Sequence, residues 1–142
     1  MTSREVFAHI DPELLSIYGE LSKREPIFHT PAFGMTGAER ERSMASGYWE
    51  IGASGRRYSR KFILRYMEEI SPIDAAVAGW TSCDHGLRRL GPETYLFTYT
   101  LWQGERHTRR ATIWQSTIDG WQILYHQGTM VTTTEDDIAP SL

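Results

Sequence analysis

The sequence predicts an α+β fold in which N-terminal helices precede an antiparallel sheet. Three observations lead to this prediction. Helical signals are concentrated before residue 72, period-two alternation of apolar residues dominates after residue 93, and two glycine-containing turns divide the second half into hairpins. Helices followed by a run of consecutive strands are typical of a layered α+β domain.

The composition is that of one soluble domain, spanning residues 1–142 with a core over about 10–131 and a polar tail over 132–142. Hydrophobic residues make up 40% and charged residues 23% of the chain. The net charge of −3 argues against nucleic acid or an anionic membrane as partner. The single cysteine, Cys83, excludes an internal disulfide. No segment resembles a signal peptide or a membrane span, so we expect a cytoplasmic protein.

Three helices are predicted from their start signals. Asp11–Glu13 combines an N-cap, a proline at the first helical position and an acid in the first turn, and this helix should end near Pro26. Thr36 and Glu39 have the spacing of a capping box, and Ser59 can cap a third helix. The third helix is expected to place its apolar residues on one face: Phe62, Ile63, Tyr66, Met67 and Ile70.

The strands are predicted from period-two alternation and from the turns that bound it. They are expected at Tyr48–Ala53, at about Asp74–Cys83 with an irregular continuation to Leu90, and at Thr94–Gln103, His107–Thr117 and Trp121–Val131.

Two turns predict the register of the hairpins. Gln103–Arg106 has glycine at the first central position, as a type II′ turn requires, so Gln103 should pair with Arg106. Asp119-Gly120 is typical of a type I′ turn, which would pair Ile118 with Trp121.

These pairings divide the sheet into two faces. One face would carry Tyr95, Phe97, Tyr99, Arg110, Thr112, Trp114, Ile123, Tyr125 and Gln127. The other would carry Leu96, Thr98, Trp102, Ala111, Ile113, Leu124 and His126. A three-residue loop with a bulge would instead shift the second pairing by one and exchange His126 for Gln127.

Several segments resemble an uncharacterised bacterial group, a domain of unknown function, within the nuclear transport factor 2-like (SnoaL-like) superfamily. Trp49–Ser59 resembles the first-strand segment of that group, and Glu25–Pro31 resembles its upstream loop. Its closing hairpin is matched by Arg110–Trp114, Asp119–Trp121 and His126–Thr129. The resemblance implies a cone-shaped, cystatin-like fold with a strongly curved sheet, a pocket at the wide end, and a homodimer formed through the sheet face turned away from the helices. It implies no reaction.

The aromatic sheet face with Arg110 is the candidate ligand pocket, because small-molecule sites are mostly apolar with a few placed polar groups. Glu50 could join it, either as a salt bridge to Arg110 or, with His126, as an acid/base pair. The candidates are Trp49, Glu50, Ser54, Tyr99, Arg110, Thr112, Trp114, Tyr125, His126 and Gln127.

No catalytic motif, cofactor or metal site is predicted. Cys83-Asp84-His85 lacks a second ligand pair, and no glycine-rich loop is placed to bind phosphate. The expected function is therefore a homodimer that binds a small hydrophobic ligand. The alternatives are an isomerase, dehydratase or hydrolase acting on a small hydrophobic substrate, and a protein-interaction module.

Overall fold

The computed structural model describes residues 6–132, 137 and 138, so most of the expected polar tail lies outside the described residues. A short 3-10 helix, η2 (Pro12–Leu14), leads into α1 (Leu15–Ser22). Then follow α2 (Gly37–Arg42), β1 (Met44–Ile51), β2 (Arg57–Ser59), α3 (Arg60–Glu69) and α4 (Ala75–Ala78). The second half consists of β3 (Thr81–Gly91), β4 (Thr94–Gln103), β5 (Arg106–Thr117) and β6 (Gly120–Met130).

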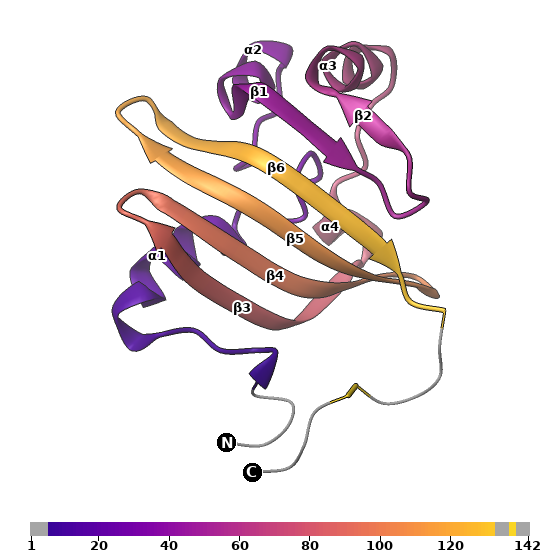
Figure 1. Ribbon diagram of the computed structural model, residues 1–142. Helices are drawn as coiled ribbons and strands as arrows, with labels where there is room; N and C mark the ends of the chain where they lie inside the picture. Colours follow the sequence, from indigo (N-terminus) through magenta and orange to yellow (C-terminus); the bar gives the residue numbers. More distant parts are fainter. Residues whose placement is uncertain (1–5, 133–136, 139–142) are drawn as a thin grey trace.

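The six strands form one sheet in the order β2-β1-β6-β5-β4-β3 (Figure 1). The predicted α+β class is confirmed, but the sheet is mixed because β1 pairs in parallel with β6. Helices α1 and α4 lie behind the sheet in Figure 1, and α2 and α3 lie beside β1 and β2. We call the helix-covered side of the sheet the inner face and the opposite side the outer face.

The predicted helix starts at Thr36 and Ser59 are confirmed. The Glu39 amide donates to Thr36 Oγ1 at 3.1 Å and the Thr36 amide donates to Glu39 Oε1 at 3.1 Å, which completes the capping box. The Phe62 amide donates to Ser59 Oγ at 3.2 Å. The apolar face expected for α3 is only partly covered: Ile63 is buried and Met67 packs against the core, whereas Phe62 remains 50% exposed.

The strand expected from Asp74 begins later than predicted. Asp74 Oδ1 instead accepts hydrogen bonds from the amides of Ala76 and Val77, and this cap starts α4. Gly79 ends the helix at a φ of 74°. The strand β3 therefore starts at Thr81.

The predicted register of the first hairpin is confirmed and that of the second is wrong. Gln103 pairs with Arg106, and Gly104 has the positive φ of 64° that the turn requires. In the second hairpin Thr117 pairs with Gly120, so the loop is Ile118-Asp119 rather than Asp119-Gly120.

A bulge in β6 then reverses the faces of the following residues. Trp114 pairs with Ile123, but Ile113 pairs with Tyr125, so Leu124 is the extra residue. Thr112 consequently pairs with His126, which is 2% exposed. Because successive strand residues point to opposite faces, the insertion turns His126 inward, and the inner-face positions predicted for Tyr125 and Gln127 are wrong.

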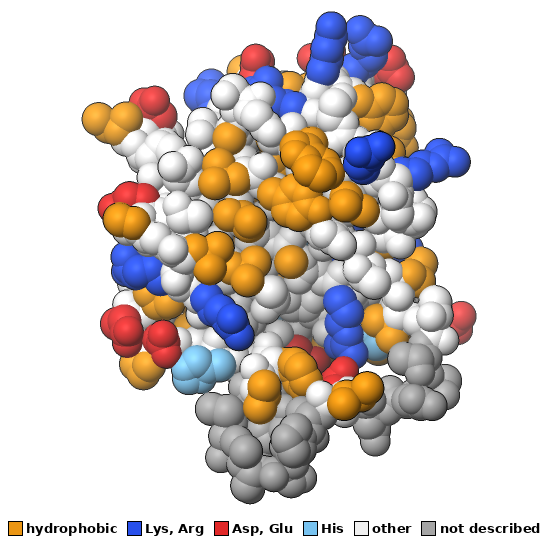
Figure 2. Space-filling view, viewed as in Figure 1, with side chains coloured by type: hydrophobic (Ala, Val, Ile, Leu, Met, Phe, Trp, Pro, Cys, Tyr) orange, Lys and Arg blue, Asp and Glu red, His pale blue; other side chains and the backbone are white. Residues whose placement is uncertain are grey.

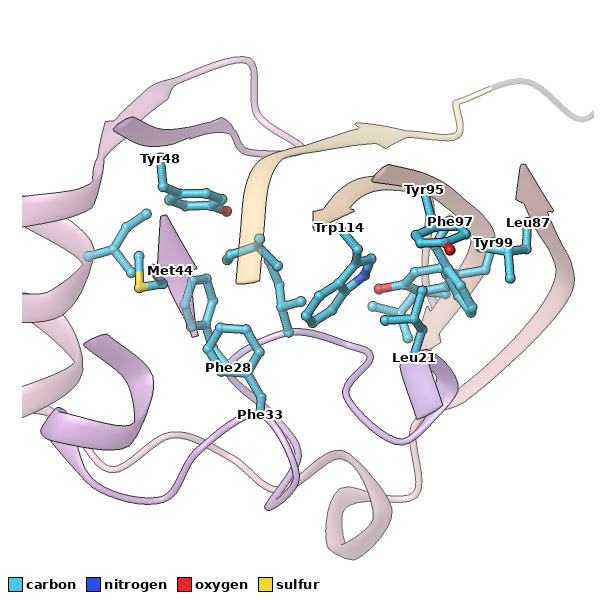
Figure 3. Close-up of a cluster of buried hydrophobic side chains, with 14 of the residues drawn as sticks. Leu21, Phe28, Phe33, Met44, Tyr48, Leu87, Tyr95, Phe97, Tyr99 and Trp114 are labelled. Carbon is cyan, nitrogen blue, oxygen red and sulfur yellow. The ribbon is translucent and has the colours of Figure 1, made fainter. Parts of the chain in front are cut away.

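The core lies between the inner face and the helices (Figure 3). Trp114 is fully buried near its middle, with Phe28 and Phe33 on one side and Leu21 and Tyr99 on the other. Within the described ranges, no helix has both the length and the apolar character needed to cross a membrane.

Candidate functional site on the inner face

A partly buried carboxyl group contacts the core from the segment after α1. Glu25 follows α1, and its side chain accepts hydrogen bonds from Tyr99 Oη at 2.7 Å and from Trp114 Nε1 at 2.9 Å. Burial raises the pKa of Glu25 to about 7, although these donors and the Thr112 hydroxyl favour the charged form. Glu25 is not among the site residues predicted from the sequence, because only the fold brings the segment Glu25–Pro31 to β4 and β5.

His126 is joined to Glu25 through one hydroxyl group. Thr112 Oγ1 lies 2.7 Å from His126 Nδ1 and also bonds to the Glu25 carboxyl. Burial, with a smaller contribution from the nearby Arg110 charge, lowers the pKa of His126 to about 3. His126 is therefore neutral, and an Nδ1–H donating to Thr112 leaves the Thr112 hydroxyl proton for Glu25.

Glu50 lies beside this group on β1. It pairs with His126 across the parallel strands, and Tyr48 Oη donates to Glu50 Oε1 at 2.9 Å. Burial raises the pKa of Glu50, while the Tyr48 hydrogen bond and the Arg110 charge oppose the increase. The carboxyl group therefore keeps its proton to a higher pH than an exposed glutamate.

Arg110 completes the inner-face cluster, which we define as Glu25, Glu50, Tyr99, Arg110, Thr112, Trp114 and His126. Arg110 Nε donates to Thr108 Oγ1 at 2.9 Å, and burial lowers the pKa of the guanidinium. Among the described residues, no carboxylate forms an ion pair with Arg110, so the direct salt bridge considered for Glu50 and Arg110 is absent. A Cβ atom at Gly128 would lie 2.7 Å from Arg110 Nη1, so glycine leaves the space that the guanidinium occupies.

The structure brings together six of the ten candidate residues: Glu50, Tyr99, Arg110, Thr112, Trp114 and His126. The remaining four lie elsewhere. Trp49 and Tyr125 contact each other on the outer face, with ring centroids 5.0 Å apart, and Tyr125 Oη donates to Gln127 Oε1 at 2.7 Å. Ser54 lies in the exposed turn after β1.

The cluster is better arranged for binding than for proton transfer. A general base works best when its pKa is near the working pH and its lone pair is accessible. His126 is too weak a base at neutral pH, and both oxygens of Glu25 already accept hydrogen bonds. In the described ranges, no group of three or more His, Cys, Asp or Glu side chains could hold a metal ion.

The outer face contains a groove of about 790 Å³, whose lining also includes Arg110 and Tyr99 of the inner-face cluster. Figure 2 shows apolar side chains across this face with lysine and arginine side chains around them. Apolar residues of three strands line the groove, including Leu96, Ile113 and Tyr125. Charges of both signs also line it: Arg88, Arg109, Asp84 and Asp137.

No protein-family model matches the sequence, and no curated protein does so either. Solved structures match the fold. A protein of unknown function from Pectobacterium atrosepticum has a TM-score of 0.63 at 12% identity, covering 86% of this chain and 94% of that one. A cystatin-like fold protein from Burkholderia xenovorans has a TM-score of 0.64 at 11% identity, covering 87% of this chain and 95% of that one.

A nuclear transport factor 2-like protein from Cytophaga hutchinsonii has a TM-score of 0.57 at 11% identity, covering 87% of this chain and all of that one. The chain therefore has the cystatin-like fold of nuclear transport factor 2-like proteins, as the resemblance implied. At these identities the likeness extends to the fold alone.

Proposed function

We propose that this chain is a homodimeric binding protein whose inner-face cluster holds a small, largely apolar ligand with one anionic group. The observation that carries the proposal is the half-buried Arg110 guanidinium, which has no carboxylate partner among the described residues. Burying a cation is costly unless a charge of opposite sign or several hydrogen bonds compensate. A carboxylate on the ligand would provide that compensation and would select the ligand by charge.

The surroundings of Arg110 support an apolar body for the ligand. Tyr99 pairs with Arg110 across β4 and β5, and both residues line the groove of about 790 Å³ together with Leu96 and Ile113. Aromatic walls with few polar groups are typical of small-molecule sites. The raised pKa of Glu50 also reduces the negative charge that would repel a carboxylate.

The proposed site can be tested with simple carboxylates. Thermal unfolding should show that phenylacetate or hexanoate stabilises the protein, whereas benzyl alcohol does not. Arg110→Met should abolish the effect. Arg106→Met should keep it, because Arg106 is exposed and donates a hydrogen bond to the turn residue Gln103. If no carboxylate stabilises the wild-type protein at millimolar concentration, the binding function is wrong.

The outer face supports the proposed homodimer. It leaves Trp49 44% and Trp102 39% exposed, and contiguous exposed apolar surface marks association sites. The partner we propose is a second copy, because a two-fold interface pairs the same patch of both subunits and would cover the exposed Trp49 and Trp102 of each.

Sedimentation at micromolar concentration tests the dimer. The wild-type protein should sediment as a dimer. Ile113→Asp on the outer face should sediment as a monomer, whereas Val77→Asp on the exposed surface of α4 should remain dimeric. A monomeric wild-type protein would exclude this assembly. The single cysteine supports a cytoplasmic location for it.

A further inference from the structure

A serine, a histidine and a tyrosine form a hydrogen-bonded row beside the inner-face cluster. His85 Nε2 lies 2.8 Å from Ser82 Oγ, and His85 Nδ1 lies 2.6 Å from Tyr18 Oη. Ser82 and His85 belong to β3, and Tyr18 belongs to α1. This is the order of groups in a base-activated hydroxyl nucleophile: nucleophile, base, and a third group that orients the base.

A bulge in β3 creates this arrangement. In a regular strand, residues three apart point to opposite faces. Here Cys83 pairs with Thr100 but Gly86 pairs with Thr98, so one residue is inserted between them, and Asp84 has a φ of 55°. The insertion places Ser82 and His85 on the same face. Bulges that re-aim a side chain are found next to active sites.

The environment of His85 suits a general base. Its ring packs against Tyr18, Phe97 and Tyr99 with centroid distances of 5.7, 5.6 and 5.9 Å, which fixes the ring orientation. Burial lowers the pKa of His85, while the Asp84 charge opposes the decrease. In the neutral ring, an Nδ1–H that donates to Tyr18 Oη leaves Nε2 to accept the Ser82 hydroxyl proton.

The nucleophile is accessible from a pocket. Ser82 is exposed and lines a cavity of about 300 Å³ between the end of α1, α4 and the start of β3. Trp80, Leu101 and Pro26 give the cavity apolar walls, Lys23 adds a cation, and Glu25 and Asp74 add carboxyl groups. A cavity of this size and character fits a short acyl group.

We propose that Ser82 is the nucleophile of an acyl-transfer site that hydrolyses small esters, with His85 as general base and Tyr18 as its positioning residue. Ser82 Oγ attacks the ester carbonyl carbon while its proton passes to His85 Nε2. The carbon–oxygen bond to the alcohol then breaks, and the leaving alkoxide takes that proton. Water attacks the acyl-Ser82 ester, His85 accepts the water proton and returns it to Ser82 Oγ, and a carboxylic acid leaves.

A fluorophosphonate probe and p-nitrophenyl acetate test this proposal on the full chain. Intact mass and peptide mapping should show one covalent phosphonyl group on Ser82. Ser82→Ala should abolish labelling and hydrolysis, and Ser71→Ala, which changes another exposed serine, should keep both. His85→Gln should slow labelling about 100-fold, the scale of general base catalysis. Circular dichroism establishes that each variant is folded.

Tyr18→Phe separates positioning from mere packing. It keeps the aromatic ring but removes the hydroxyl group, so the pH profile of labelling should shift while Ser82 remains the labelled residue. Absence of a Ser82 adduct on the wild-type protein, or labelling at an undiminished rate in folded His85→Gln, would overturn the proposal. Ser82 labelling and stabilisation by a carboxylate are separate readouts on the wild-type protein, so this site and the anion site can fail independently.

Discussion

The two faces of the sheet differ in the side chains that they bury and expose. On the inner face, polar groups are buried and joined to one another: Tyr99, Trp114 and Thr112 all donate to Glu25. On the outer face, apolar groups remain exposed, with Trp49 and Trp102 more than a third accessible. The stability of the inner face therefore depends on buried hydrogen bonds that water cannot replace. The outer face instead leaves apolar surface exposed that a partner could cover.

Because of this difference, substitutions on the inner face should affect stability and substitutions on the outer face should affect association. A buried group that loses its partner costs free energy, whatever the protein binds. An exposed side chain has little effect on the isolated fold but can determine association. Substitutions at matched positions on the two faces should therefore differ in unfolding free energy, and four experiments can test the contrast.

The largest effect is expected from protonation of His126. Its folded pKa of about 3 lies below the value of about 6.5 for an unfolded histidine, so the stability due to the neutral ring is complete above pH 6.5 and is lost as the pH falls toward 3. The loss should reach about 5 kcal/mol, more than half of it by pH 4. Urea unfolding of wild type and His126→Gln from pH 7 to pH 4 measures this loss of stability.

Thr98→Val on the outer face should lose stability with falling pH as the wild-type protein does. If His126→Gln also loses as much stability as wild type over this range, His126 is not the titrating group.

The next effect compares two tryptophans. Trp114→Ala should lower the free energy of unfolding by about 4 kcal/mol, because it opens a cavity and removes a donor from Glu25. Trp102→Ala, on the outer face, should cost about 1 kcal/mol in the monomer, mainly through its stacking on His107. Chemical unfolding at submicromolar concentration compares them, and equal losses would remove the distinction between the faces.

Glu25 should give a pH dependence of opposite sign to that of His126. Its folded pKa of about 7 lies above the ordinary value of 4.5, so the stability due to the protonated carboxyl is complete below pH 4.5 and is lost as the pH rises through 7. The loss should approach about 3 kcal/mol. Glu25→Gln keeps an acceptor for Trp114 and a donor for Tyr99 but does not titrate. Its unfolding free energy should therefore exceed that of wild type most at pH 8, and a constant difference from pH 5 to 8 would contradict the prediction.

The smallest effect compares two threonines on neighbouring strands. Thr112→Val should cost about 2 kcal/mol, because His126 and Glu25 each lose a hydrogen-bond partner inside the core. Thr98→Val on the outer face should change stability by less than about 0.5 kcal/mol. Differential scanning calorimetry is sufficient for this pair. A Thr112→Val protein as stable as Thr98→Val would show that the buried chain of hydrogen bonds contributes little.

Local signals determined much of the fold. The capping box at Thr36, the cap at Ser59 and the glycine at Gly104 each define a boundary or a turn within a few residues. Because the first hairpin turn is correct, the pairing of Tyr99 with Arg110 follows directly from the sequence. The order of helices and strands is sufficient for the α+β class.

Only the tertiary structure determined which functional side chains lie together on each face of the sheet. The extra residues at Leu124 and Asp84 cannot be located from period-two alternation, because a bulge is selected by how the whole strand packs. One inserted residue turned His126 inward, and another aligned Ser82 with His85. Glu25 lies 74 residues before Tyr99, and no local sequence pattern predicts a contact between residues so far apart in the chain. The sequence by itself therefore determined the fold class, two helix starts and one hairpin register, while packing of the sheet against the helices decided the sites.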